Sequence, residues 1–131
     1  MSYLHALETL QWSTHLEVDQ EGETTYYDAL AFEPSEDLKK RIKREWDSFK
    51  EQALDLGFDP ELHRLAPYDP TQGNLWDYVA HDFILTRNGH GSGFWEPDRY
   101  EKPWGDKLTQ LSETYQEIDL YLSDNNLLEA Y

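Results

Sequence analysis

Residues 35–58 read Ser-Glu-Asp-Leu-Lys-Lys-Arg-Ile-Lys-Arg-Glu-Trp-Asp-Ser-Phe-Lys-Glu-Gln-Ala-Leu-Asp-Leu-Gly-Phe and predict one long amphipathic helix. Apolar side chains recur there at spacings of three and four residues, which places them on one face of a helix. These side chains are Leu38, Ile42, Trp46, Phe49, Ala53 and Leu56. Ser35 is the expected N-cap, and Gly57 suits the position just after the helix, where Phe58 can fold back on the last turn.

The segments on either side of this helix are less regular. Apolar residues between Tyr3 and Leu10 recur at helical spacing and predict an amphipathic helix that ends near Trp12. Acidic and apolar residues alternate over 13–33, which predicts either a loop or a weak hairpin with its turn at Glu21-Gly22. Prolines and a glycine make residues 59–75 an irregular connection.

A strand and a tight turn are predicted next. Residues 78–86 carry β-branched and aromatic side chains on both faces, as a covered strand does. Asn88-Gly89 follows, and this pair favours a hairpin turn because both residues tolerate positive φ. The returning strand is expected to include Phe94-Trp95, and the loop after it to lie between Pro97 and Pro103.

The C-terminal part predicts a further helix and a short hairpin. Apolar residues at 108, 111, 115 and 118 share a helical face, with Asp106 as the expected N-cap. Residues 118–122 and 127–131 predict two strands joined by a turn at 124–126. Together these elements predict one α+β domain over residues 1–131, with two or three helices on a short, mostly antiparallel sheet of about four strands.

The composition is strongly acidic and lacks cysteine. Of 131 residues, 27 are acidic and 11 are basic, which gives a formal charge of −16. Residues 1–38 carry nine acidic and no basic side chains, and residues 67–131 carry twelve acidic and four basic ones. The lack of cysteine excludes disulfides, thiolate zinc sites and cysteine nucleophiles. With no apolar run of membrane-spanning length and no leader pattern, a cytoplasmic protein is expected.

This acidity also constrains the partners. An anionic surface repels phosphate backbones, which disfavours direct binding of nucleic acid, and it attracts basic protein surfaces. The alternative is that the charge serves only solubility. The five cations of residues 39–44 either neutralise the acidic N-terminal segment within the fold or form a nucleic-acid patch.

Residues 81–95, His-Asp-Phe-Ile-Leu-Thr-Arg-Asn-Gly-His-Gly-Ser-Gly-Phe-Trp, are the one segment whose composition suggests chemistry. One hypothesis is a divalent metal held by His81, Asp82 and His90, although neighbouring strand residues point to opposite faces. A second is an anion held by the backbone amides of residues 88–93, including Asn88, together with Arg87. A third is general-base catalysis by His90, oriented by Asp82 or Arg87.

A structural interpretation of the same segment is preferred. Its glycines permit a bulged hairpin or the close approach of another backbone segment. His81 and Arg87 can pair with carboxylates, while Asp82 can accept hydrogen bonds from loop amides. On this interpretation the protein binds no metal and no cofactor. His5, His15 and His63 stand alone in the sequence and are expected to be ordinary residues of the surface or the edge of the core.

The same segment carries a resemblance to a known family. The stretches 81–83, 85–91 and 93–95 (His-Asp-Phe, Leu-Thr-Arg-Asn-Gly-His-Gly and Gly-Phe-Trp), followed by Gly-Asp-Lys-Leu-Thr at 105–109 and Asp-Leu-Tyr at 119–121, resemble small bacteriophage proteins of unknown function. The similarity covers residues 76–122. It departs from the family's common residues at Ala80 (glycine), Ile84 (tryptophan) and Glu96 (aspartate). The resemblance implies a phage or prophage origin but assigns no role to any residue.

Small acidic phage proteins often bind host machinery, and some mimic DNA. We therefore expect a non-enzymatic protein that binds the basic surface of a host or defence nucleic-acid-handling protein in the infected cell, acting as a DNA-mimic inhibitor. The alternative is a small enzyme or ligand-binding domain with its site at residues 81–95, and a third hypothesis is a partner bound through apolar surface. The carboxylates expected to replace phosphates are Glu17, Asp19, Glu21, Glu23, Asp28, Glu33, Glu36, Asp37, Asp106, Glu113, Glu117, Asp119 and Asp124.

Overall fold

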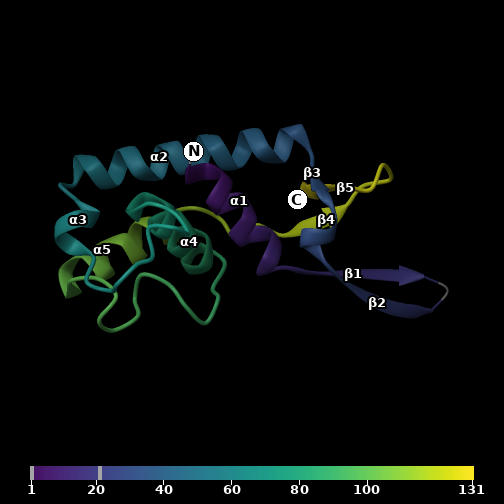
Figure 1. Ribbon diagram of the computed structural model, residues 1–131. Helices are drawn as coiled ribbons and strands as arrows, with labels where there is room; N and C mark the ends of the chain where they lie inside the picture. Colours follow the sequence, from purple (N-terminus) through teal and green to yellow (C-terminus); the bar gives the residue numbers. More distant parts are fainter. Residues whose placement is uncertain (1, 21) are drawn as a thin grey trace.

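The computed structural model describes residues 2–20 and 22–131, without the side chains of residues 17–20 and 24–26 (Figure 1). Within these residues the chain forms five α-helices, one 3-10 helix and five strands in two small sheets. The helices are α1 (Ser2–Trp12), η1 (Ala29–Ala31), α2 (Glu36–Asp55), α3 (Pro60–His63), α4 (Leu75–Arg87) and α5 (Lys102–Glu113). The strands are β1 (His15–Gln20), β2 (Glu23–Asp28), β3 (Glu33–Pro34), β4 (Leu120–Leu122) and β5 (Leu127–Ala130). The α+β class is thus confirmed.

The long helix α2 forms where its sequence predicts it. The Ser35 hydroxyl accepts a hydrogen bond from the Leu38 amide at 3.1 Å and caps the N-terminus. At the other end Gly57 adopts φ +97°, and the Phe58 amide donates to the Ala53 carbonyl at 3.0 Å. The apolar stripe is buried in the core except for Leu56, which is exposed because it lies at the C-cap beyond the last helical residue.

The N-terminal third resolves into a helix and a hairpin. The expected helix up to Trp12 is confirmed as α1. Of the two alternatives for residues 13–33, the structure shows the hairpin: β1 pairs with β2 antiparallel, and Gly22 in its turn has φ +83°. The expected irregular connection at 59–75 contains one short helix, α3, which begins at Pro60 behind the N-cap Asp59.

The strand expected at residues 78–86 is wrong, because these residues form most of the helix α4. Asn74 and Asp77 form a capping box, in which each side chain accepts a hydrogen bond from the other's backbone amide at 2.9 and 2.8 Å. Side chains on several faces of α4 are buried, since it packs against α1, α3 and α5 and its Phe83 ring stacks on Phe49 of α2 at 4.3 Å. Burial on all sides gives a helix the apolar composition of a covered strand.

The hairpin expected at Asn88-Gly89 is also wrong. Asn88 is the C-cap of α4, Gly89 follows at φ +64°, and the His90 amide donates to the Leu85 carbonyl at 2.9 Å. The tolerance of Gly89 for positive φ thus serves a helix end rather than a hairpin turn. Residues 88–101, including the expected strand at Phe94-Trp95, form an irregular segment that contains no named strand.

The fifth helix, α5, begins earlier than expected. Pro103 lies in its first turn and Asp106 inside it, while Glu101 is the N-cap without a side-chain hydrogen bond. Proline at the start of a helix removes a donor that has no partner there, so it favours this boundary. The helix ends at Glu113, so Ile118 reaches the core from the segment after it.

The predicted C-terminal strands are confirmed as β4 and β5, which pair antiparallel. Their turn contains Asn126 at φ +61°. β5 also pairs in parallel with β3, so the described residues form a mixed three-stranded sheet and a separate two-stranded hairpin instead of one sheet of four strands. Both sheets lie at one end of the molecule, while α3, α4 and α5 lie toward the other, and α2 spans the two (Figure 1).

Candidate functional site

The structure separates the five polar residues of the 81–95 segment. His81 and Asp82 line a pocket beside α4. Arg87 is buried at the end of this helix, and Asn88 is its C-cap. His90 is exposed, with its ring edge-on to Trp12 at 6.2 Å. No hydrogen bond in the described residues joins His90 to Asp82 or Arg87.

Arg87 and Asn88 fasten the end of α4 to the segment before β4. Arg87 Nη2 donates to Glu45 Oε1 at 2.7 Å and to the Gln116 carbonyl at 2.6 Å. Burial lowers the pKa of Arg87, against the opposing effect of the Glu45 carboxylate. Asn88 Oδ1 accepts a hydrogen bond from the Ile118 amide at 2.9 Å. These contacts hold neighbouring elements together and leave Arg87 turned away from solvent.

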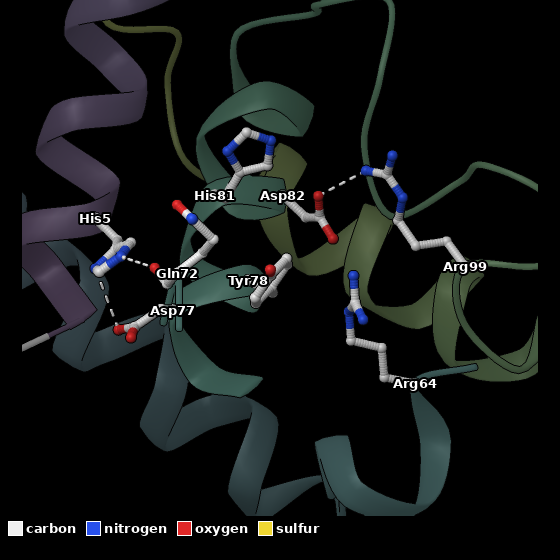
Figure 2. A pocket seen from close by; sticks show the side chains of 8 residues that line it. All are labelled: His5, Arg64, Gln72, Asp77, Tyr78, His81, Asp82 and Arg99. Atoms are coloured by element: carbon white, nitrogen blue, oxygen red, sulfur yellow. Dashed lines mark hydrogen bonds and ion pairs between the residues drawn. The ribbon is translucent and has the colours of Figure 1, made fainter. Parts of the chain in front are cut away.

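A pocket of about 270 Å³ lies between α1, α4 and two loops (Figure 2). It is lined by His5, Arg64, Gln72, Asp77, Tyr78, His81, Asp82 and Arg99. Four of these residues come from α4, at positions 77, 78, 81 and 82. Because residues three and four apart share a helical face, the helix brings Tyr78, His81 and Asp82 to one side. Within the described residues, no group of three His, Asp or Glu side chains is placed to hold a metal ion.

Asp82 is the buried acid of this pocket. Its side chain is 2% exposed. Oδ1 accepts a hydrogen bond from Arg99 Nη1 at 2.7 Å, and Oδ2 accepts one from the Tyr100 hydroxyl at 2.7 Å. Burial raises the pKa of Asp82, although Arg99 and Tyr100 both favour its ionised form. Burial and the Asp82 carboxylate together hold the pKa of Tyr100 well above 10, so its hydroxyl remains a donor.

Arg99 is positioned from two sides. Besides Asp82, it donates from Nη2 to Glu96 Oε2 at 2.9 Å. The other oxygen of Glu96 accepts a hydrogen bond from the Gly93 amide at 3.1 Å. Glycine at 93 lets the loop lie against α4, because a Cβ atom there would clash with Thr86 Oγ1. The glycine-rich segment therefore positions a pocket residue through its backbone.

Two histidines line the pocket toward α1. His81 stacks on Trp12 with ring centroids 5.6 Å apart, and its Nδ1 lies 3.2 Å from Thr9 Oγ1. The Thr9 hydroxyl donates to the His5 carbonyl at 2.7 Å, so Nδ1 of His81 must supply the hydrogen between them and Nε2 is left as an acceptor. Burial lowers the pKa of His81 and favours this neutral form. His5 Nδ1 lies 3.4 Å from Asp77 Oδ1.

Arg64 also lines the pocket, and no carboxylate in the described part of the chain forms an ion pair with it. Its guanidinium lies 4.8 Å above the centre of the Tyr78 ring and 5.8 Å from that of Tyr100. Nη1 donates to the Ala66 carbonyl at 2.7 Å. Nε is buried and has no hydrogen-bond partner among the residues that the structure describes.

Sequence reasoning missed six of the eight pocket residues, since only His81 and Asp82 were candidates. A strand at 78–86 turns His81 and Asp82 to opposite faces, whereas a helix gives them neighbouring positions with Tyr78. If residues 77–82 are taken as helical, the spacing of Asp77, Tyr78, His81 and Asp82 indicates that these side chains lie on one side of the helix. Arg64 and Arg99 reach the pocket from loops, and no local pattern marks them.

The acidic candidates lie elsewhere. Glu17, Asp19 and Glu21 lie outside the described side chains. The other ten are all exposed: Glu23, Asp28, Glu33, Glu36, Asp37, Asp106, Glu113, Glu117, Asp119 and Asp124. Of these ten, only Glu33 and Glu36 form an ion pair in the described residues, both with Lys39. Asp106 and Glu113 lie on α5, apart from the rest.

A comparison with protein-family models, curated proteins and solved structures finds no match to this chain. The resemblance of residues 76–122 to bacteriophage proteins therefore stays a prediction. No helix among the described residues has the length and apolarity that crossing a membrane requires.

Proposed function

We propose that this chain is a binding protein whose acidic strand end docks on the basic surface of a nucleic-acid-handling protein, where its carboxylates take the place of backbone phosphates. The strand end consists of residues 15–37 and 117–130, which include both sheets (Figure 1). A host or defence enzyme as the partner follows from the phage resemblance, and inhibition follows from competition with nucleic acid for one surface.

The observation that carries this proposal is the segregation of charge along the fold. The strand end holds twelve acidic residues and no lysine or arginine. The rest of the chain holds fifteen acidic and eleven basic residues, so the strand end accounts for −12 of the formal charge of −16. Two segments distant in sequence meet there through the pairing of β3 with β5. Solubility alone does not require that twelve acidic residues lie in two segments without a lysine or arginine.

The state of these carboxylates supports the same function. Glu117, Asp119 and Asp124 are exposed and form no ion pair in the described residues. They are therefore accessible to the cations of an incoming basic surface. Charge complementarity of this kind accelerates association and favours basic partners, and it weakens as salt screens the charges.

Two variants with the same net charge test the proposal. The strand-end variant carries Glu23→Gln, Glu117→Gln, Asp119→Asn and Asp124→Asn. The helical-end variant carries Glu51→Gln, Asp55→Asn, Asp98→Asn and Glu101→Gln, all at exposed positions. Each protein is titrated into purified DNA- and RNA-processing enzymes bound to a fluorescent duplex, and fluorescence anisotropy reports the release of the duplex.

We expect the wild type to displace the duplex from at least one enzyme at low salt. The strand-end variant should compete about tenfold more weakly, and the helical-end variant should differ from the wild type by less than about twofold. Equal losses in both variants would show that net charge alone acts, and failure to displace the duplex from any enzyme would reject phosphate mimicry.

A further inference from the structure

We infer that the pocket between α1 and α4 binds a small organic anion, whose carboxylate or phosphate group is held by Arg64. This site is separate from the acidic strand end. The strand end is proposed to attract a basic surface, whereas the pocket must attract an anion. Figure 2 shows Arg64 reaching from its loop toward the space beside Tyr78 and Asp82.

The first support is the incomplete set of partners of Arg64. A guanidinium carries five N–H donors, and within the described residues the guanidinium of Arg64 makes one hydrogen bond, to the Ala66 carbonyl. Its Nε is buried without an acceptor. Nη2 has no hydrogen-bond partner among the described residues and, unlike Nε, is not buried, so it is the donor that an anion in the pocket can reach. A carboxylate or phosphate matches the planar fork of arginine.

The carboxylates of the pocket do not supply that acceptor. Both oxygens of Asp82 already accept hydrogen bonds, from Arg99 and Tyr100. Asp77 accepts from the Asn74 amide and lies beside His5. In a chain with 27 acidic residues, Arg64 nevertheless lies on a pocket wall with no carboxylate in contact among the described residues.

Comparison with Arg87 distinguishes a ligand-binding arginine from a structural one. Arg87 also has one buried nitrogen without a partner, Nη1, but its side chain is fully buried and bound to Glu45 and Gln116. Arg64 instead lines an open pocket and is oriented by stacking on Tyr78 and Tyr100. Stacking fixes the direction of the guanidinium without using its donors.

The remaining lining defines the class of ligand. A volume of about 270 Å³ is just below the usual range for ligand pockets, so the ligand is small. The Tyr78 ring offers an apolar wall, while Nε2 of neutral His81 accepts and the Gln72 side chain can donate or accept. A short organic body with one anionic group and one polar group fits these features.

The experiment is a titration of the whole chain with benzoate, phenyl phosphate and the neutral benzamide, followed by NMR. We expect saturable shifts of the Arg64 Nε–H signal and of the His81 ring signals with at least one of the two anions. Benzamide should bind at least about tenfold more weakly, since it lacks the charge that arginine recognises. Comparison of benzoate with phenyl phosphate distinguishes a carboxylate ligand from a phosphate ligand.

Arg64→Gln should weaken anion binding by at least about tenfold, while Arg44→Gln, at an exposed position of α2, should change it by less than about twofold. Arg64→Lys retains the charge and should bind between these limits. If neither anion shifts the pocket signals of the wild type, or if benzamide binds as tightly as benzoate, the inference is wrong, whatever the variants do. Binding that Arg64→Gln leaves unchanged would also contradict it.

Discussion

Three arginines show how their contacts decide what a single residue does in this protein. Arg87 is bound on both sides by Glu45 and the Gln116 carbonyl and has no exposed side-chain surface. Arg99 is partly exposed and held by two carboxylates at the edge of the pocket. Arg64 has stacking partners and one carbonyl. A guanidinium bound entirely within the protein stabilises the fold, whereas one with donors left over can bind a ligand.

Arg87→Ala tests the structural role at the end of α4. The substitution leaves Glu45 partly buried with only Arg41 as a partner and removes the contacts to Gln116, so it should lower the free energy of unfolding by about 3 kcal/mol. The control Arg44→Ala, at an exposed site, should stay within about 0.5 kcal/mol of the wild type. Urea unfolding measures both. An Arg87→Ala protein as stable as the wild type would contradict this role.

His81 gives the protein a predicted sensitivity to mild acid. Burial lowers the pKa of His81 in the folded state below its unfolded value of 6.5, so the unfolded chain binds the proton more readily. The stability contributed by neutral His81 is therefore complete above pH 6.5 and is lost as the pH falls through the folded pKa. Burial raises the pKa of Asp82, which acts in the opposite direction at lower pH.

The measurement is the free energy of urea unfolding as a function of pH. His81→Gln should reduce the loss of stability between neutral and mildly acidic pH, because no imidazole remains to be protonated. His15→Gln, at an exposed position, is the control and should retain the slope of the wild type. Equal slopes in the wild type and His81→Gln would exclude His81 as the cause.

At the scale of elements, α2 and α4 show which parts of the fold a sequence can specify. The boundaries of α2 are local, because Ser35, Gly57 and a one-sided stripe lie within its own sequence. α4 has no such stripe, since its neighbours cover it on several sides. Its best local indication is the capping pair Asn74 and Asp77, three residues apart, while the apolar run after it fits a strand equally well.

The candidate site was even less accessible from sequence. His81 and Asp82 were identifiable because unusual residues cluster there, but the same cluster also suggested Arg87, Asn88 and His90. In the structure Arg87 and Asn88 make structural contacts, whereas His90 is exposed beside Trp12. The partners that complete the pocket come from α1 and from two loops, and only tertiary packing brings them to α4.

Gly93→Ala tests how the 88–101 segment packs on α4. A Cβ at residue 93 would lie 3.3 Å from Thr86 Cα and would clash with Thr86 Oγ1, which accepts the Phe94 amide. The substitution should cost about 1–3 kcal/mol of stability, as overpacking does. Gly91→Ala is the matched control, because a Cβ there meets no atom within 4 Å, and it should change stability by less than about 0.5 kcal/mol.

Thermal unfolding of both glycine variants provides the measurement. If Gly93→Ala and Gly91→Ala have the same melting temperature, the packing of the loop does not depend on the close approach of residue 93 to Thr86. The pocket supplies a second readout, since Gly93 and Arg99 both bind Glu96. Displacement of the loop should therefore weaken anion binding in Gly93→Ala but not in Gly91→Ala.

At the scale of the whole molecule, the uneven distribution of charge is expected to lower the stability of the folded state. Residues 15–37 and 117–130 carry twelve acidic residues and no lysine or arginine, while Lys39 of α2 pairs with Glu33 and Glu36 beside them. Like charges held together repel, and this repulsion is relieved when the chain unfolds. A strand end that costs stability is expected to persist only where its charge has a use, which is consistent with the proposed recognition of a basic partner.

The strand-end and helical-end variants measure that cost without any partner present. At about 0.01 M salt, where the Debye length is about 30 Å, the strand-end variant should melt above the wild type because four repelling charges are gone. The helical-end variant should gain less, since its carboxylates share their region with most of the cations. At about 1 M salt the screening length falls to about 3 Å, and the three melting temperatures should converge. If the two variants gain equally at low salt, the strand end carries no special repulsion and the segregation of charge along the sequence does not extend to the folded surface.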